Sequence, residues 1–148
     1  MLFYGVSDVF KLPSKDEIKP TEEQEKQFVK CVLEGKPFTQ TVTVGNVVVL
    51  FTTPSAEEYP ILHAAERDLF ADYLFVSNIQ SIRQGEQVLY LKDAKTNFND
   101  RIAKLTQIFK DSIILPLIVG HWYRFREIYN KLFEMAVSPD FFERKGSI

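Results

Sequence analysis

Two histidines are the residues of this 148-residue chain whose type and spacing best suit metal chemistry. His63 precedes Glu66 by three residues, so on a helix an imidazole and a carboxylate would share one face, as they do in metal sites. With Asp72 as a further ligand, this pair defines one hypothesis, a small metal-dependent hydrolase. The alternative is a surface histidine. We expect a surface histidine, because the second histidine, His121, lies far along the chain and neither histidine lies within a known catalytic motif.

The other reactive residue types also have structural explanations. Cys31 would need a neighbouring histidine base to act as a nucleophile, and its apolar surroundings predict a buried, inert thiol instead. The motifs Ser55-x-x-Glu58 and Ser138-Pro139-Asp140 are typical of helix starts and stops. Lys36 follows a glycine, but no phosphate-binding loop surrounds it. We therefore expect no enzyme, no cofactor and no metal.

The charge balance limits the classes of partner. The formal net charge is −2 and charged residues make up 26% of the chain, so there is no basic field for nucleic acid. Arg124 and Arg126, beside Tyr123 and Phe125, would suit base stacking, but a solvated helix face is the simpler interpretation. The longest apolar run, 113–119, is shorter than the roughly 20 residues that span a bilayer. The first residues lack the basic and apolar regions of a signal peptide. We expect neither a nucleic-acid nor a membrane partner.

A β-hairpin is the clearest of the elements that would position these residues. Phe38, Val42 and Val44 alternate with threonines at 39, 41 and 43, and residues 47–52 are β-branched or apolar. Gly45-Asn46 between them is a two-residue turn signal. The sequence therefore predicts two antiparallel strands, followed directly by the capping box that begins at Ser55.

A long helix and a second hairpin are predicted next. The spacing of apolar residues predicts a helix over about 56–75, capped by Ser55 and Glu58. Pro60 either kinks the start of this helix or is itself the true start of the helix. A second hairpin is predicted over 79–91, with Gly85 at its turn.

Helices are predicted at both ends of this central region. Thr21 and Gln24 form a capping box for a helix that Gly35 ends, and its buried stripe would be Phe28, Val29, Val32 and Leu33. Later in the chain, Thr96 or Asn97 would cap a further helix. Pro116 and Gly120 are expected to interrupt the segment after it. The last helix follows, with a stripe that includes Trp122, Phe125, Tyr129 and Leu132.

This order of elements predicts an α+β fold with two β-hairpins, three to five α-helices and a helical C-terminal half. Residues 21–148 would form a single domain, and residues 1–20 an irregular arm. The last helix is apolar around much of its circumference, so it lies either in the core or under another chain.

The same order resembles that of small tail or baseplate-hub proteins of tailed bacteriophages, and of tail assembly chaperones. The matching segments cover roughly 21–142 and are Gly35-Lys36-Pro37-Phe38-Thr39, Val42–Val49, Ser55–Glu58 and Tyr129–Phe142. The resemblance implies a non-enzymatic component of the tail or baseplate, assembled in the host cytoplasm and located in the virion. Its partners would be further copies of itself or other tail proteins. The alternative is a chaperone that holds the tape-measure protein and is absent from the mature particle.

Aromatic side chains are the expected contact residues of such a protein. They make up 14% of the chain, and aromatic anchors dominate the energetics of protein interfaces. The 1–20 arm would pack along a neighbouring chain. The expected interface residues are Phe3, Tyr4, Phe10, Trp122, Tyr123, Phe141 and Phe142.

Overall fold

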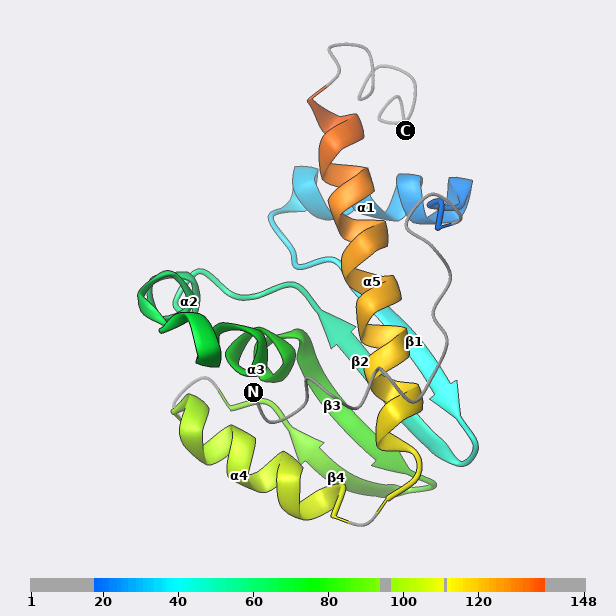
Figure 1. Ribbon diagram of the computed structural model, residues 1–148. Coiled ribbons are helices and arrows are strands. Elements are labelled where there is room, and N and C mark those ends of the chain that lie inside the picture. Colours follow the sequence, from blue (N-terminus) through cyan, green and yellow to red (C-terminus); the bar gives the residue numbers. More distant parts are fainter. Residues whose placement is uncertain (1–17, 94–96, 111, 138–148) are drawn as a thin grey trace. The chain divides into compact units, whose positions relative to one another are not determined.

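The computed structural model describes residues 18–93, 97–110 and 112–137, and it has the predicted α+β fold (Figure 1). The described residues belong to two compact units. Residues 39–122 form the first, here called the sheet unit, and residues 18–38 with 123–137 form the second, the helical unit. The expected division into a 1–20 arm and a 21–148 domain stays a prediction, because most of the arm lies outside the described residues.

Both predicted hairpins are confirmed, and they join into one antiparallel sheet. The first consists of β1 (Thr39–Val44) and β2 (Val47–Thr52), and the second of β3 (Ile79–Gln84) and β4 (Gln87–Leu91). The strand order is β1-β2-β3-β4, so β2 and β3 connect the two hairpins.

Glycine makes both hairpin turns possible. Gly45 and Gly85 have φ angles of 61° and 60°, a conformation that costs glycine little. The cross-strand pairs Val49–Ile82 and Ile82–Tyr90 then place apolar side chains on one face of the sheet.

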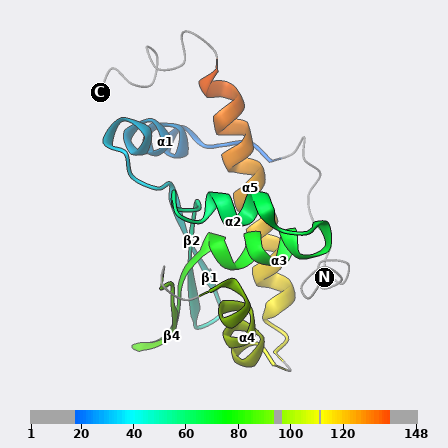
Figure 2. The ribbon, with the colours of Figure 1, turned by 90° about the vertical axis from the view of Figure 1, so that its left-hand side faces the viewer.

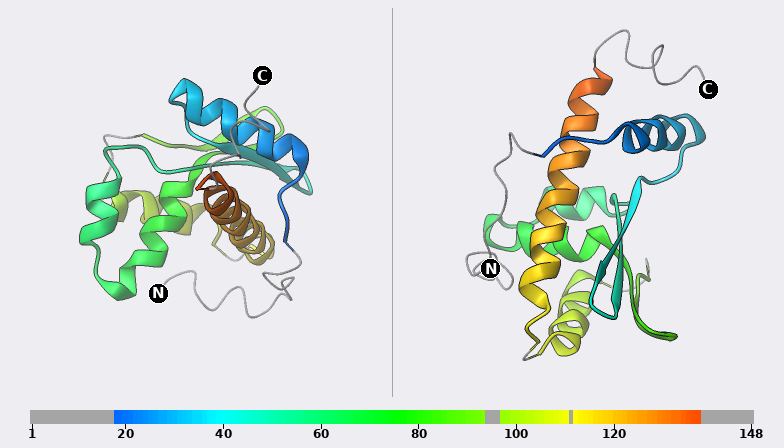
Figure 3. Two further views of the ribbon diagram at one scale, coloured as in Figure 1. Left: turned by 90° about the horizontal axis from the view of Figure 1, so that it is seen from above. Right: turned by 90° about the vertical axis from the view of Figure 1, so that its right-hand side faces the viewer.

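Helices cover that face of the sheet unit. These are α2 (Tyr59–Ala64), α3 (Arg67–Asn78), α4 (Phe98–Ile108) and the first part of α5 (Leu115–Ala136). Helix α3 contacts β2 and β3, while α4 contacts β4 and α3. In Figure 2 and in the right panel of Figure 3, all four segments lie on the same side of the sheet.

The predicted helix over 56–75 is wrong, because the structure divides this segment. Residues 56–58 form a turn, α2 follows, and Ala65 adopts an extended conformation with ψ of 140° before α3 begins. Helix α3 starts anew, with the amides of Leu69 and Phe70 donating to the carbonyl of Glu66, and it continues to Asn78. Pro60 is the second residue of α2, so the helix begins one residue before the start that Pro60 predicts, and the proline lies in the first turn, where its missing N–H costs no helical hydrogen bond.

The core of the sheet unit is built around α3 and α5. Trp122 is 2% exposed and packs edge-on against Phe75, with ring centroids 5.0 Å apart. Its indole donates a hydrogen bond of 2.9 Å to Asn78 Oδ1, and the Asn78 amide donates to the carbonyl of Thr52. Trp122 therefore lies in the core, so the structure does not place it on the surface expected of an interface residue.

The helical unit contains α1 (Glu22–Glu34) with the predicted caps at both ends. The Thr21–Gln24 capping box is present, and Gly35 ends the helix in the left-handed conformation. Phe28 and Phe38 pack edge to face at 6.1 Å.

The predicted buried stripe of α1 is wrong in its second half. Phe28 and Val29 are buried, whereas Val32 and Leu33 are 50% and 64% exposed. The stripe is therefore one turn shorter than the apolar pattern predicts, and the end of α1 presents apolar side chains to solvent.

Helix α5 is continuous, so the predicted interruptions at Pro116 and Gly120 are wrong. Pro116 is the second residue of the helix, where no helical hydrogen bond needs its missing N–H. One stripe of α5 is buried, and Phe133 is 58% exposed. Across residues 18–93, 97–110 and 112–137, no helix combines the length and apolar character that a membrane span requires.

Candidate functional site

A buried carboxylate is the centre of the most densely bonded polar cluster in the sheet unit. Glu58 is 3% exposed. Its Oε2 accepts hydrogen bonds from Arg101 Nη1 at 2.8 Å and from the Ser77 hydroxyl at 2.9 Å. Its Oε1 accepts from the amide and the hydroxyl of Ser55, both at 2.9 Å, and forms an ion pair with Lys92. Two cations thus neutralise one buried carboxylate, whose oxygens also accept from two serines.

Four elements far apart in sequence bring this cluster together. Glu58 ends the turn after β2, Ser77 lies in the last turn of α3, and Lys92 directly follows β4. Arg101 lies in the first half of α4, whose start Asn97 caps by accepting from the amide of Asp100. The cluster therefore connects both hairpins to two helices, and it depends on the complete sheet unit.

Both cations have further partners that fix their side chains. The Lys92 ammonium donates to the carbonyl of Ser77 at 2.9 Å, and Arg101 Nη2 donates to the carbonyl of Asp93 at 3.0 Å. The Arg101 guanidinium also lies 4.8 Å from the centre of the Phe98 ring, a cation–π distance. We call Glu58, Lys92, Arg101, Ser55 and Ser77 the Glu58 cluster.

The surroundings change the acidity of these groups. Burial acts to raise the pKa of Glu58, but the hydrogen bonds from Lys92, Ser55 and Ser77 outweigh it and hold that pKa below its ordinary value. Burial lowers the pKa of Lys92. Glu58 is therefore a fixed anion with its oxygens occupied, which makes it a structural counter-ion rather than a general base.

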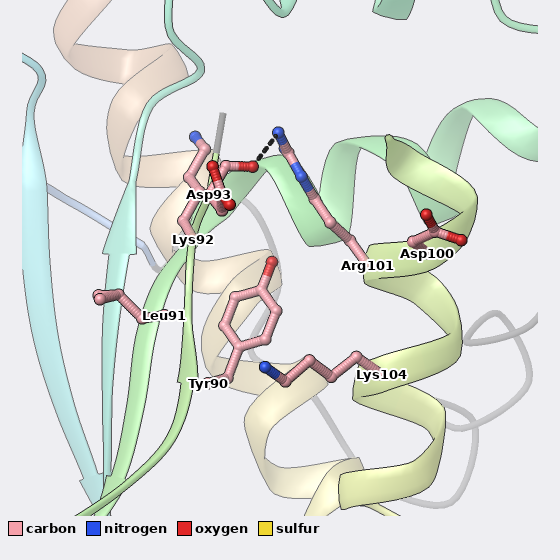
Figure 4. Close-up of a pocket in the computed structure, with 7 residues that line it drawn as sticks. All are labelled: Tyr90, Leu91, Lys92, Asp93, Asp100, Arg101 and Lys104. Atoms are coloured by element: carbon pink, nitrogen blue, oxygen red, sulfur yellow. Dashed lines mark hydrogen bonds between the residues drawn. The ribbon is translucent and has the colours of Figure 1, made fainter. Parts of the chain in front are cut away.

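A cavity of about 470 Å³ lies beside the cluster, between the end of β4 and α4 (Figure 4). Its lining is mostly polar or charged and consists of Tyr90, Leu91, Lys92, Asp93, Asp100, Arg101 and Lys104. Tyr90 is 3% exposed, and its hydroxyl has no hydrogen-bond partner among the described residues. Burial raises the pKa of Tyr90, so the phenol keeps its proton and can donate it in a hydrogen bond.

A second hollow, the α2–α3 groove, is apolar. It encloses about 480 Å³ and is lined by Pro60, Ile61, Ala64, Ala65, Glu66, Leu69 and Tyr73. The break at Ala65 creates this groove by turning the chain between two short helices. Such a surface suits an apolar side chain or helix of another protein.

The structure does not assemble a metal site around His63. His63 is exposed on α2 near the Tyr59 ring, Glu66 caps α3, and Asp72 is buried within α3. No cluster of three or more histidine, cysteine, aspartate or glutamate side chains suited to a metal ion occurs in the described part of the chain. Cys31 is half-buried rather than fully buried, and burial raises the pKa of its thiol.

Two of the seven expected interface residues lie in the described part of the chain. Tyr123 is half-buried on α5, in the helical unit, and Trp122 is buried as described above. The remaining expected contacts lie outside the described residues, as does the motif Ser138-Pro139-Asp140; they are Phe3, Tyr4, Phe10, Phe141 and Phe142.

The sequence pattern indicates little of the Glu58 cluster. The capping-box pattern predicts that Ser55 and Glu58 begin a helix; the two residues do bond, but they close a turn instead of a helix. One signal was available: Phe98, Arg101 and Leu105 follow the i, i+3, i+7 spacing of a buried stripe, and all three are buried. An arginine on such a stripe requires a buried anionic partner.

Comparison with protein-family models, with curated proteins and with solved structures finds no match to this chain.

Proposed function

We propose that this chain is a non-enzymatic assembly component of a tailed-phage tail or baseplate, which acts through protein–protein interfaces. The observation that carries this proposal is the apolar α2–α3 groove on the sheet unit. The resemblance in the order of elements supplies the phage context.

The exposed side chains near the groove support a docking role. Ile61 and Leu69, which line it, are 49% and 39% exposed. On the same two helices, Tyr59 and Phe70 are 40% and 41% exposed. Single exposed apolar residues are ordinary, and we infer a docking surface from the occurrence of several on two neighbouring helices.

The occupant that we propose is the apolar arm of a neighbouring copy of this chain. Phe3, Tyr4 and Phe10 within residues 1–20 would supply aromatic anchors, which are typical of interface hot spots. Glu66 is the charged residue in the groove lining, and Lys11 directly follows Phe10 in the arm. In the proposed complex, Lys11 would pair with Glu66 while the aromatic side chains occupy the apolar part of the groove.

Light scattering over a concentration series tests the proposal. We expect the wild-type mass to rise above the 17.2 kDa of one chain, and Ile61→Glu to prevent that rise by placing a carboxylate in the apolar groove. Gln107→Glu on α4 is a matched control, because it adds the same charge at an exposed position outside the groove lining. Assembly by Ile61→Glu equal to that of the control would refute the role of the groove.

A tail assembly chaperone that holds the tape-measure protein is the second candidate, because the same groove would suit an apolar segment of a client. The two candidates differ in where the chain is found at the end of assembly. Mass spectrometry of purified virions distinguishes them: stoichiometric presence supports the structural component, and absence from the particle supports the chaperone.

A further inference from the structure

We propose that α2 is a hinged flap, which opens and closes the α2–α3 groove by rotating about Ala65 and Glu66. This inference rests on the proposed function, because it concerns how a docked segment enters the same groove. It depends on the backbone at the break between the helices, on the lack of a side-chain cap there, and on how little of α2 is buried.

The break between the two helices occupies two residues with extended backbone. Ala65 has φ of −66° and ψ of 140°, and Glu66 has φ of −61° and ψ of 150°. The amide of Ala65 donates a long hydrogen bond of 3.3 Å to the carbonyl of Leu62, and the amide of Glu66 donates none within the described part of the chain. Two adjacent residues of this kind can absorb a change of backbone angles while both helices stay intact.

Local chemistry does not fix the angle between the helices. Residues 61–78 contain neither glycine nor proline, so no residue type requires the break, and the apolar spacing would also satisfy one helix. Glu66 is the N-cap residue of α3, but its side chain makes no capping hydrogen bond. The angle is therefore set by the packing of α2 on the rest of the unit.

That packing is slight. Leu62, which is 4% exposed, is the one buried residue within Tyr59–Ala64, and the other five residues of α2 are exposed. A helix of six residues is also too short to be stable without packing. In Figure 1 and in the left panel of Figure 3, α2 lies on the outer side of α3. Segments with so few buried contacts open locally at a low cost in free energy.

The other end of α2 is fixed, so the helix tilts without leaving the unit. Glu58 directly precedes α2 and is buried in the Glu58 cluster, and its carbonyl accepts from the amide of Leu62 at 3.0 Å. Helix α3 is anchored in the core by Phe75 and Val76, both 0% exposed. Helix α2 is thus tethered between a fixed turn on one side and the hinge on the other.

The lining of the groove connects this movement to docking. Three of the lining residues come from α2 and two from α3, and the two hinge residues lie between them. Rotation at the hinge therefore changes the width of the groove. An open flap admits the apolar arm, and closing the flap buries Ile61 against it, as lids do when they close over a ligand.

Hydrogen exchange of the full chain, followed by NMR, tests the hinge below the concentration of self-association. We expect the amides of residues 62–64 to exchange at least about tenfold faster than those of Phe75 and Val76. Glu66→Pro should slow exchange at residues 62–64 by about two- to fivefold. Proline fits the φ of Glu66 and the extended backbone of Ala65 before it, and it removes conformations from the open hinge.

Glu66→Ala is the matched control for this variant. It removes the same exposed carboxylate but leaves the hinge unrestricted, so exchange at residues 62–64 should stay within about twofold of the wild type. Equal exchange in the Glu66→Pro and Glu66→Ala variants would overturn the hinge. If Glu66→Pro does not fold, the wild-type comparison decides, because exchange at residues 62–64 as slow as at Phe75 and Val76 would also overturn it.

Self-association tests the closing of the flap over a docked segment. At a concentration where the wild type associates, its amides at residues 62–64 should exchange about tenfold more slowly than those of Ile61→Glu, because the docked arm holds α2 closed. Equal exchange in the associated and unassociated proteins would overturn this closing. A wild-type chain that stays monomeric would refute the docking role of the groove instead, and the Glu66 variants would still decide the hinge.

Discussion

The Glu58 cluster and the α2–α3 groove lie in the same unit and are built in opposite ways. The cluster buries three charged side chains that partner one another, whereas the groove exposes apolar side chains. Residues from four separate elements make the cluster, but two consecutive helices make the groove. We therefore expect a change in the cluster to act on folding, and a change in the groove to act on association.

Removing the central carboxylate should have the largest effect on stability. Glu58→Gln leaves Lys92 and Arg101 buried without a counter-ion, which costs about 3–5 kcal/mol of unfolding free energy. Urea denaturation measures this loss. The control is Glu57→Gln, because Glu57 is the exposed neighbour in the same turn, and a surface change of this kind costs within about 0.5 kcal/mol. Equal midpoints for the two variants would refute the structural role of the cluster.

The pH dependence of stability should come next in size. The pKa of Glu58 is lowered in the folded protein from its ordinary value of 4.5. The stabilisation is therefore complete above about pH 4.5, and it is lost as the pH falls through the lower folded value. We expect thermal melting temperatures to drop over that acidic range in the wild-type protein. In Glu58→Gln this part of the drop should be absent, and identical pH profiles would contradict the assignment.

Changes to the groove and to the arm should weaken the same self-association contact, and the groove change should have little effect on folding. Deleting residues 1–17 and substituting Ile61→Glu should each reduce self-association, and combining them should reduce it no further, because both remove the same contact. Analytical ultracentrifugation measures the three dissociation constants. Additive losses would separate the arm from the groove, while Ile61→Glu should change the unfolding free energy by no more than about 0.5 kcal/mol.

Tyr90→Phe should have the smallest effect on stability. The hydroxyl has no hydrogen-bond partner among the described residues, so its removal is expected to leave the melting temperature equal or slightly higher. A clear loss of stability would indicate that the hydroxyl has a structural partner.

The elements that could be predicted from the sequence are those determined by local chemistry. Gly45-Asn46 and Gly85 fix both hairpin turns, and Thr21 with Gly35 bounds the first helix. The break at Ala65 could not be predicted in this way, because residues 61–74 keep an apolar spacing that one helix would also satisfy.

The candidate site was missed because its contacts are long-range. Arg101 and Glu58 are 43 residues apart and meet only once the sheet has formed. The Ser55–Glu58 pair resembles a capping box. This local pattern explains Glu58 without any long-range partner, so it does not predict that the carboxylate pairs with distant cations. Pro116 predicts an interruption, but its position in the first turn of α5 makes it compatible with a continuous helix.

The most direct test of the central claim, assembly through the apolar groove, is the solution mass of the full chain measured by light scattering from low to high concentration. We expect the wild-type protein to form a discrete oligomer or to show a mass that rises with concentration, and Ile61→Glu to keep the mass of a single chain. A wild-type protein that remains a 17.2 kDa monomer throughout would contradict self-assembly through this surface.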